Sequence, residues 1–261
     1  MPRTTRPTDP ALAEPPPRPA THGSLTHRAA GELVDALEED IVLGRLHPRE
    51  RLVEDTLIER FDAKRHTVRE ALAALERMGL VQRVPNRGAF VRELTPTEVE
   101  NLYAVRELLE LEAARQVVAR STGELVDTLS ALQRRHDAAT RARDMASAFR
   151  LNIAFHRAFF ERCGNPELLE AIEAFGQKAH GIRSLSLGRS GYLSQSGREH
   201  WAIVRALERR DAETVVELCR KHIRVARDIY IEAFRARAPD GPREPAGTAS
   251  RRRASRLPVA V

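Results

Sequence analysis

Three histidines in the second half of the chain lie in helix-like stretches that are far apart in sequence. They are His156 in NIAFHRAFF, His200 in REHWAIVRAL and His222 in CRKHIRVA, and Asn152 lies four residues before the first, on the same helical face. Three imidazole rings and one side-chain oxygen that converged inside a bundle would suit Zn²⁺ or another first-row divalent ion. Spacing alone indicates this only weakly, because no His-Glu-x-x-His motif is present and a single histidine in a helix is more often a surface or core residue.

The stretch KRHTVREAL, residues 64–72, concentrates basic side chains on the first turn of a predicted helix. Because the macrodipole already makes that end positive, acidic residues would stabilise it better, and a helix that breaks this rule is expected to meet an anionic partner. Arg65 and Arg69 share a face and can point together into the major groove of DNA, where arginine recognises guanine. The Thr67 hydroxyl and the first N–H groups suit phosphate. The residues expected to contact DNA from this helix are Lys64, Arg65, His66, Thr67 and Arg69.

The elements around this stretch must place it against DNA. Apolar residues at helical spacing predict helices within residues 27–46, 53–61 and 67–78, and two β-prone runs follow at 80–84 and 89–91. Three helices and a hairpin in this order are typical of a winged helix-turn-helix, whose third helix lies in the major groove. The order therefore favours a DNA-binding surface over the alternative, an ordinary solvated basic face.

The turn PNRG separates the two β-prone runs and would form the tip of the wing. Arg87 can reach a minor groove from such a tip, and Gly88 permits close approach of the backbone. The wing residues expected at the DNA are Asn86, Arg87 and Gly88.

From Thr95 onward nearly all of the chain has the pattern of amphipathic helices. Thr95 can cap the first of them, with Pro96 at the first helical position and Glu98 completing a capping box. Gly164 and Pro166 mark a clear break between two later helices. The predicted helices cover about 96–119, 122–142, 145–163, 166–187, 197–209 and 212–236. We therefore expect a mainly α fold, with an N-terminal winged helix-turn-helix and a C-terminal all-helical antiparallel bundle.

The composition of the chain is that of a globular protein, and its basic charge leans toward a polyanionic partner, although a few arginines in a tail can also produce such a charge. It has 261 residues, of which 42% are hydrophobic and 31% charged, with a net charge of +6 and a pI of about 10.0. Two cysteines give no disulfide framework, which fits a reducing cytoplasm. No apolar run is long enough for a membrane span, and the N-terminus lacks the apolar core of a secretory signal.

Four segments follow from these patterns. Residues 1–24 are rich in Pro, Thr and Ala, and we expect an unstructured tail there. Residues 25–94 would form the DNA-binding domain, and residues 95–237 a helical domain for effector, metal and dimerisation. Residues 238–261 would form a second tail, whose arginines can touch phosphate or acidic lipid, although a solvated tail is the simpler interpretation.

Residues 27–93 resemble the N-terminal domain of GntR-superfamily regulators. The resemblance rests on the Gly-x-x-x-Pro turn of GRLHP, on VREAL, on the Gly-Leu that follows it and on the Arg-Gly of the wing. It implies DNA contacts at Arg65, Arg69 and the Arg87–Gly88 wing. Lys64 stands where the family usually has Ser, His66-Thr67 where it has Thr-Pro, and Asp55 where it often has Arg. The operator is therefore expected to differ from the common ones.

Residues 97 to about 235 resemble the all-helical FCD ligand domain of the FadR subfamily. The matching segments are VRELLELEAA, NIAFH, EHWAIVRALERRDAETV and the helix that contains His222. The resemblance implies that the four positions Asn152, His156, His200 and His222 hold a divalent ion, with Zn²⁺ as first choice and Ni²⁺ or Mn²⁺ as alternatives. Asn152 replaces the family's Asp, so the site should bind its ion less tightly.

The same resemblance gives Arg106 a role in holding the carboxylate of an effector. The simpler alternative is an ion pair within the helix, because Glu110 lies four residues later on the same face. His180 and Arg183 are also expected to face the cavity, on less evidence.

These expectations combine into a ligand-responsive transcriptional regulator. A homodimer would bind a palindromic double-stranded operator, and a small organic acid bound at the metal site would shift its DNA affinity, with repression favoured by family tendency. Two alternatives stay open: a regulator that responds to metal without an organic effector, and a metalloenzyme with a DNA-binding appendage. The second lacks an obvious general base, because Glu199 lies about 100° around the helix from His200, and we assign no catalytic residue.

Overall fold

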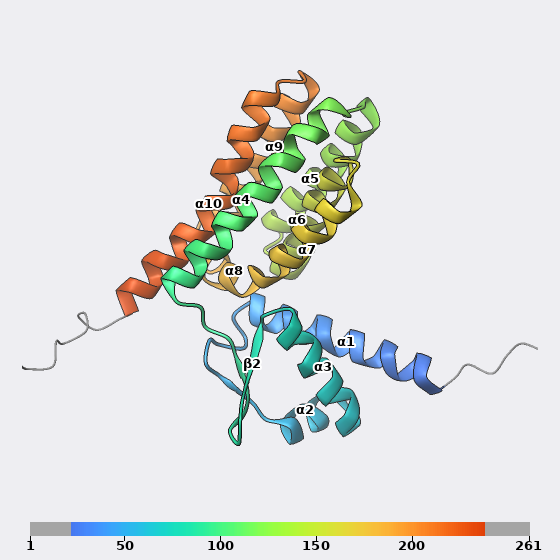
Figure 1. Cartoon of the computed structure of the whole chain (residues 1–261), viewed down its shortest axis with the longest axis vertical. Coiled ribbons are helices and arrows are strands. Elements are labelled where there is room, and N and C mark those ends of the chain that lie inside the picture. The colour runs from blue at the N-terminus through green and yellow to red at the C-terminus, as the bar shows by residue number, and fades with distance from the viewer. Residues whose placement is uncertain (1–21, 238–261) are drawn as a thin grey trace, which may run out of the picture.

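The computed structural model describes residues 22–237, and it divides them into a small N-terminal part and a larger helical bundle (Figure 1). The first helix begins at His22, so it takes in residues 22–24, which the composition places in the tail. The tails expected at 1–21 and 238–261 lie outside the described residues. Within the described part, no helix is long and apolar enough to cross a membrane.

The N-terminal part is a three-helix unit with a small sheet, as predicted for a winged helix-turn-helix. Its helices are α1 (His22–Val42), α2 (Glu54–Phe61) and α3 (Arg65–Arg77), and its strands are β1 (Arg51–Leu52), β2 (Val81–Val84) and β3 (Gly88–Val91). Their apolar faces share one core, in which Leu37, Val68 and Leu75 are fully buried. Burial of this core holds α3 rigidly against α1.

The sheet has one strand more than the predicted hairpin. Its order is β1-β3-β2 with both pairs antiparallel, and Arg51 is opposite Phe90 while Leu52 is opposite Ala89. A strand of two residues is too short to show a period in the sequence. Leu52 is nevertheless buried in the core, so β1 joins the loop after α1 to the base of the wing.

The helical bundle follows the predicted capping signals closely. Its helices are α4 (Pro96–Ala119), α5 (Gly123–Arg141), α6 (Met145–Glu161), α7 (Pro166–Lys178), α8 (His180–Leu187), α9 (Tyr192–Glu208) and α10 (Ala212–Arg237). The predicted capping box at the start of α4 is present in full. The long helices α4 and α10 lie side by side and antiparallel along one face, and α5, α6 and α9 pack behind them (Figure 1).

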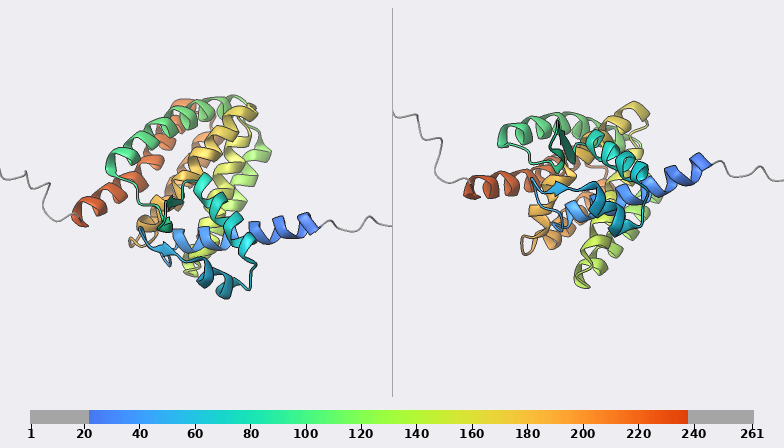
Figure 2. Two further views of the ribbon diagram at one scale, coloured as in Figure 1. Left: turned by 60° about the horizontal axis from the view of Figure 1, so that its bottom comes forward. Right: turned by 90° about the horizontal axis from the view of Figure 1, so that it is seen from below.

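Two expected helices differ from the structure. The stretch 166–187 is two helices that meet at Ala179, and the next helix begins at Tyr192 rather than at residue 197. No proline marks the first break, but Gly176 and Gly181 flank it and weaken a continuous helix. The bend brings the start of α8 against α1 of the N-terminal part, at the base of the bundle (Figure 2).

The two parts are joined by a short connection that is held in place. The phenolic group of Tyr230 on α10 accepts a hydrogen bond from the Leu94 N–H at 3.1 Å and donates one to the Leu94 carbonyl at 2.9 Å. Elsewhere in the junction, the Leu80 side chain lies against Gly181 at the start of α8. These contacts place α8 between the DNA-binding part and the interior of the bundle.

Candidate DNA interface and metal site

Helix α3 presents its basic first turn to solvent. Lys64 is the N-cap in an extended conformation without a side-chain capping bond, and the first turn contains no acidic residue. Lys64, Arg65, His66 and Arg69 are all exposed. The unpaired N–H groups of this turn and its four exposed basic side chains give a surface that suits an anionic chain.

Thr67 does not share this exposed face. Its side chain is only 5% exposed, because it lies one helical turn before Ala71, on the side of α3 that packs into the core. This burial argues against the expected contact of the Thr67 hydroxyl with phosphate, which stays a prediction, and leaves the backbone N–H of the residue as the better placed donor.

The two arginines expected to read bases are paired with acidic residues of α2. Arg65 Nη2 lies 2.7 Å from Asp55 Oδ1, and Arg69 Nε lies 2.9 Å from Glu54 Oε2. Arg65 Nη1 is also 3.5 Å from the same Glu54 oxygen, so both arginines meet on one carboxylate, which confirms that they share a face. Exposed pairs of this kind are weak, so a phosphate or base can replace them at small cost.

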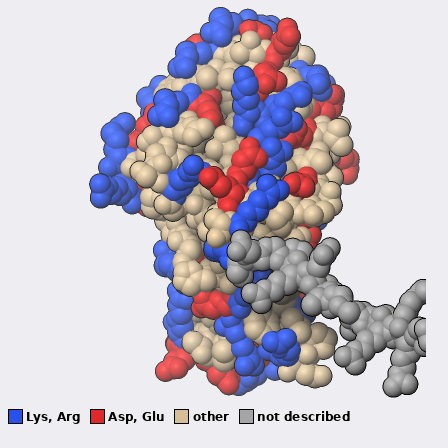
Figure 3. Space-filling model, turned by 90° about the vertical axis from the view of Figure 1, so that its left-hand side faces the viewer, with Lys and Arg blue, Asp and Glu red and all other residues tan. Residues whose placement is uncertain are grey.

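The wing tip has the backbone that its sequence predicts. Asn86 and Gly88 both have positive φ, at 60° and 94°, and Gly88 has room for a Cβ, so its φ rather than crowding favours glycine. Arg87 is exposed, with its guanidinium 5.9 Å from the centre of the Phe90 ring. On the face of the molecule shown in Figure 3, basic and acidic side chains are intermixed.

The three histidines meet at one point inside the bundle, and we call them the histidine cluster. His156 comes from α6, His200 from α9 and His222 from α10. The Nε2 atoms of His156 and His222 are 3.1 Å apart, and those of His200 and His222 are 3.3 Å apart. One ligand atom from each lies within 4.8 Å of the others, so residues far apart in sequence form one site.

Hydrogen bonds at the other ring nitrogens fix the tautomers of two of these rings. His200 Nδ1 donates to Gln133 Oε1 at 2.7 Å, and His222 Nδ1 donates to Glu199 Oε2 at 2.6 Å. The orientation of the Gln133 amide is set by its own bond to Asp137 at 2.7 Å. In neutral rings, Nε2 of His200 and of His222 therefore carries a lone pair that points into the cluster.

This arrangement fits a divalent metal ion. In a tetrahedral site with Zn–N distances of about 2.0–2.1 Å, two ligand nitrogens lie about 3.3–3.4 Å apart, close to the 3.1 and 3.3 Å between the Nε2 atoms. The lone pairs of His200 and His222 repel at this separation unless a cation lies between them, whereas His156, whose tautomer no other bond within the described residues fixes, can donate from Nε2 to His222 when no ion is bound. Asn152 lies one turn before His156 on α6 and is half-buried, and its part as a ligand stays a prediction.

Burial favours the neutral form of the histidine rings, which is the form that binds a metal ion. It lowers the pKa of His156 and of His200 well below the usual value, and the nearby His222 lowers both further. Burial alone would raise the pKa of Glu199, but the bond from His222 leaves it lowered. The two imidazoles are thus neutral at pH 7, as a metal ligand must be, and a carboxylate stabilises the third ring.

The sequence analysis did not identify Gln133, and it considered Glu199 only as a general base for the enzyme alternative, not as the partner of His222. Gln133 is fully buried and continues the stripe of Leu125 and Leu129 on α5. A polar residue on this apolar face is the feature of the sequence that could have identified it. Glu199 has no such signal, because its orientation depends on α10 lying against α9. Both act on the rings that would bind the metal, as outer partners of metal-ligating histidines usually do.

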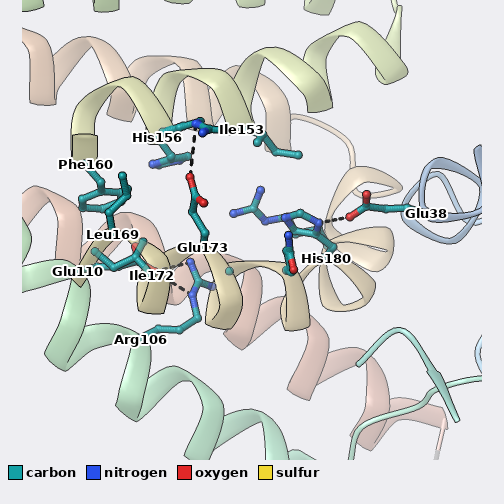
Figure 4. Close-up of a pocket in the computed structure, with 14 residues that line it drawn as sticks. Glu38, Arg106, Glu110, Ile153, His156, Phe160, Leu169, Ile172, Glu173 and His180 are labelled. Atoms are coloured by element: carbon teal, nitrogen blue, oxygen red, sulfur yellow. Dashed lines mark hydrogen bonds and ion pairs between the residues drawn. The ribbon is translucent and has the colours of Figure 1, made fainter. Parts of the chain in front are cut away.

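A cavity of about 240 Å³ opens beside the histidine cluster, and His156 is part of its wall (Figure 4). Arg106 lines it as expected, but its Nε donates to Glu110 Oε1 at 2.8 Å and both side chains are more than nine-tenths buried. The alternative reading of Arg106 as half of an intrahelical ion pair is thus present in the structure. His180 and Arg183 also line the cavity, as expected.

The cavity contains one cation without a carboxylate partner. Arg183 forms no ion pair within the described residues, and its Nη1 is buried without a hydrogen-bond partner. The other cavity arginines are paired, Arg106 with Glu110 and Arg157 with Glu173 at 3.4 Å. Arg183 is therefore the cavity side chain that most lacks an anion.

Comparison with known families and proteins assigns both parts of the chain. Residues 29–91 match the bacterial regulatory proteins of the gntR family, and residues 101–225 match the FCD domain. An uncharacterized HTH-type transcriptional regulator, BphR of Paraburkholderia xenovorans (strain LB400), is 31% identical over 198 residues, which cover 72% of this chain and 79% of that protein.

Two further likenesses agree with these matches. The HTH-type transcriptional repressor RspR of Escherichia coli (strain K12) is 26% identical over 187 residues, covering 72% of this chain and 82% of the repressor. The solved structure of E. coli McbR/YncC superposes with a TM-score of 0.68 at 22% identity, covering 80% of this chain and 98% of that one. The likeness to the McbR/YncC structure supports the fold of this chain.

Proposed function

This chain belongs to the gntR family of bacterial regulatory proteins and has an FCD domain, and on that premise we propose that it is a repressor released from DNA by a small organic acid. It is a DNA-binding transcriptional regulator rather than an enzyme. The acid would bind in the bundle cavity beside a divalent metal ion held by the histidine cluster. Repression is supported by the repressor names of relatives such as RspR.

The convergence of the three histidines, one of which lines the cavity, carries this proposal. His156 belongs both to the histidine cluster and to the lining of the cavity, so an ion held by the cluster would be reached from the cavity. A metal ion there supplies a positive charge for an anionic head group. The neutral, buried rings of His156 and His200 suit an ion and add no positive charge of their own.

Arg183 is better suited than Arg106 to bind the carboxylate of the acid. The charge of Arg106 is already balanced by Glu110, and breaking a buried ion pair is costly. Arg183 has a buried donor without an acceptor, and a carboxylate would supply that acceptor with a charge-assisted hydrogen bond. Neutral sugars would leave this guanidinium without a counter-charge.

A homodimer on a palindromic operator completes the proposal, since a twofold protein matches twofold DNA. Leu108 on α4 supports it, because this leucine is 75% exposed on a long helix at the surface of the bundle. The expected location is the cytoplasm, where the two buried free cysteines, Cys163 and Cys219, would stay reduced.

Elemental analysis and thermal unfolding test the proposal together. Protein purified without chelator should contain close to one equivalent of Zn²⁺, Ni²⁺ or Mn²⁺, and His200→Ala should lose it, whereas the exposed His66→Ala should keep it. Small organic acids should then raise the melting temperature of the metal-loaded protein, because a ligand that binds only the native state stabilises it.

Three outcomes would distinguish the proposed function from its alternatives. Less than about a tenth of an equivalent of metal, with no uptake of added ions, would show that the histidines are structural. Stabilisation by neutral sugars and not by acids would exclude the carboxylate. Metal that alters DNA binding with no response to any acid would favour the metal-responsive alternative.

A further inference from the structure

One carboxylate in the wall of the bundle cavity comes from the DNA-binding part. Glu38 lies on α1, and its Oε1 accepts a hydrogen bond from Nδ1 of His180, the first residue of α8. The His180 side chain is 9% exposed and that of Glu38 is 16% exposed. In Figure 4, this pair and His156 lie at separate places on the cavity wall. At this place the cavity wall is formed by Glu38 and by its partner His180, which lies 142 positions later in the sequence.

The surroundings of Glu38 are those of a carboxylate site. The Nδ1–H of His180 is a donor, and Arg183 on the same helix lacks an ion-pair partner among the described residues. Burial lowers the pKa of His180, the bond to Glu38 opposes this, and the charge of Arg183, three residues later on α8, lowers it again. Arg183 also contributes to the low pKa of His156, after burial and His222. The charge of Arg183 therefore acts both on His180 and on His156.

Helix α1 transmits its position to the recognition helix. Leu33, Leu37 and Ile41 on one face of α1 are buried in the same core as Leu72 and Leu75 of α3. A close-packed core moves as a unit, so α3 follows any shift of α1. Glu38 lies between these anchoring residues in sequence and points out of the core toward α8.

We propose that Glu38 occupies the subsite for a second carboxylate of the effector, so that a dicarboxylic acid binds by displacing it from His180. This inference rests on the proposed function, in which an acid enters the bundle cavity. One carboxylate of the acid would lie toward the histidine cluster and the other at His180 and Arg183. The acid can occupy this subsite only when Glu38 has left, so it binds better to the state in which α1 has separated from α8. Differential binding of this kind couples the cavity to the DNA-binding part.

The neighbouring residue provides a matched control. Glu39 also lies on α1 and also crosses to the bundle, where it pairs with Arg150 on α6, but it does not line the cavity. Glu38→Gln keeps the shape and the acceptor oxygen while removing the competing charge. Glu39→Gln removes a charge from the same junction without touching the subsite.

Calorimetric titration of the zinc-loaded full chain with succinate tests the proposal, with acetate as a probe that has a single carboxylate. Glu38→Gln should raise the affinity for succinate about tenfold, because the acid no longer competes with a charge-assisted bond. Glu39→Gln should leave that affinity within about twofold, and His180→Gln should lower it. The affinity for acetate should change less than that for succinate in Glu38→Gln. Hydrogen exchange of α1 should also increase when succinate is added to the unaltered protein.

Opposite results overturn the inference in distinguishable ways. If succinate binds the unaltered protein and Glu38→Gln binds it no more tightly, Glu38 does not occupy the subsite, while the proposed function stands. Equal gains in Glu38→Gln and Glu39→Gln would show that loosening the junction, rather than emptying a subsite, is responsible. If neither acid binds any form of the zinc-loaded protein, the proposed function fails and this inference fails with it.

Discussion

Two hydrogen bonds decide which nitrogen atoms of the histidine cluster are free for a metal ion. Gln133 and Glu199 accept from the Nδ1 atoms of His200 and His222, which leaves both Nε2 atoms directed at the same point. The imidazoles alone could be found from their helical context, but their partners could not, because the contacts join helices that are distant in sequence. At this scale, the sequence indicates which histidines could bind a metal ion but not which residues orient their rings.

We expect Glu199 to act as a positioning residue for a metal ion, so Glu199→Gln should lower zinc affinity by about 10–100-fold, as loss of an outer partner of a metal-bound histidine does. The glutamine can still accept a hydrogen bond but adds no negative charge beside His222. Competition with a fluorescent zinc chelator measures the change, and Glu208→Gln, an exposed change on the same helix, serves as control. Equal zinc affinity in all three proteins would remove Glu199 from the site.

Asn152 tests the fourth position of the same site. An Asp at this position would add a charged oxygen, so Asn152→Asp should bind zinc more tightly than the natural protein, while Asn152→Ala should bind it less tightly. The chelator competition gives both values. Identical affinity in the three forms would place Asn152 outside the coordination shell.

The buried histidines also predict how the metal-free protein responds to pH. The pKa values of His156 and His200 are well below 6.5, mainly because of burial. Below about pH 6.5, the unfolded chain therefore binds more protons than the folded one, and the stability present above that pH is lost as pH falls toward the folded values. Melting temperatures measured with chelator should fall between about pH 7 and pH 5, and His200→Gln should flatten the slope while His66→Asn should not. A flat profile for the unaltered protein would contradict the burial of these rings.

At the scale of elements, helix starts with local signals were predictable and breaks without them were not. The caps at Thr95 and Asn165 each accept a hydrogen bond from a backbone N–H three residues later, which is chemistry that a short stretch contains in full. The break at Ala179 is different, because it depends on packing of α8 against α1. Strand β1 was missed for the same reason, since two residues acquire their conformation from β3.

We expect the start of α2 to limit how strongly α3 binds DNA. Asp55 and Glu54 neutralise Arg65 and Arg69 in the DNA-free protein, and they must be displaced when the arginines turn to bases. Asp55→Asn should therefore strengthen DNA binding slightly, by up to about 1 kcal/mol, whereas Arg65→Ala and Arg69→Ala should each weaken specific binding by about 1–3 kcal/mol. Gel-shift titrations against one selected DNA site compare the variants. Unchanged affinity in both arginine variants would mean that another element reads the DNA.

At the scale of the whole molecule, the important contacts are those between the two parts. Sequence predicted a winged helix-turn-helix followed by a helical bundle, and this architecture is confirmed. It could not predict that Glu38 of α1 reaches the cavity of the bundle, because no periodicity relates residues 142 positions apart. The hydrogen bonds of Tyr230 to Leu94 and the contact of Gly181 with Leu80 likewise join residues that are far apart in sequence. The contacts on which the proposed coupling of the cavity to DNA rests are therefore found only in the three-dimensional structure.

The most direct test of a metal-assisted acid switch is the DNA affinity of the zinc-loaded protein with and without succinate. The DNA would be a site selected by the protein itself from random sequences, and calorimetry would establish that succinate is bound. A repressor of the proposed kind should lose about tenfold or more of its DNA affinity when the acid binds, which corresponds to a coupling of about 1.4 kcal/mol. His200→Ala should bind DNA but show no response. Equal DNA affinity with and without bound succinate would contradict control of DNA binding through the bundle cavity.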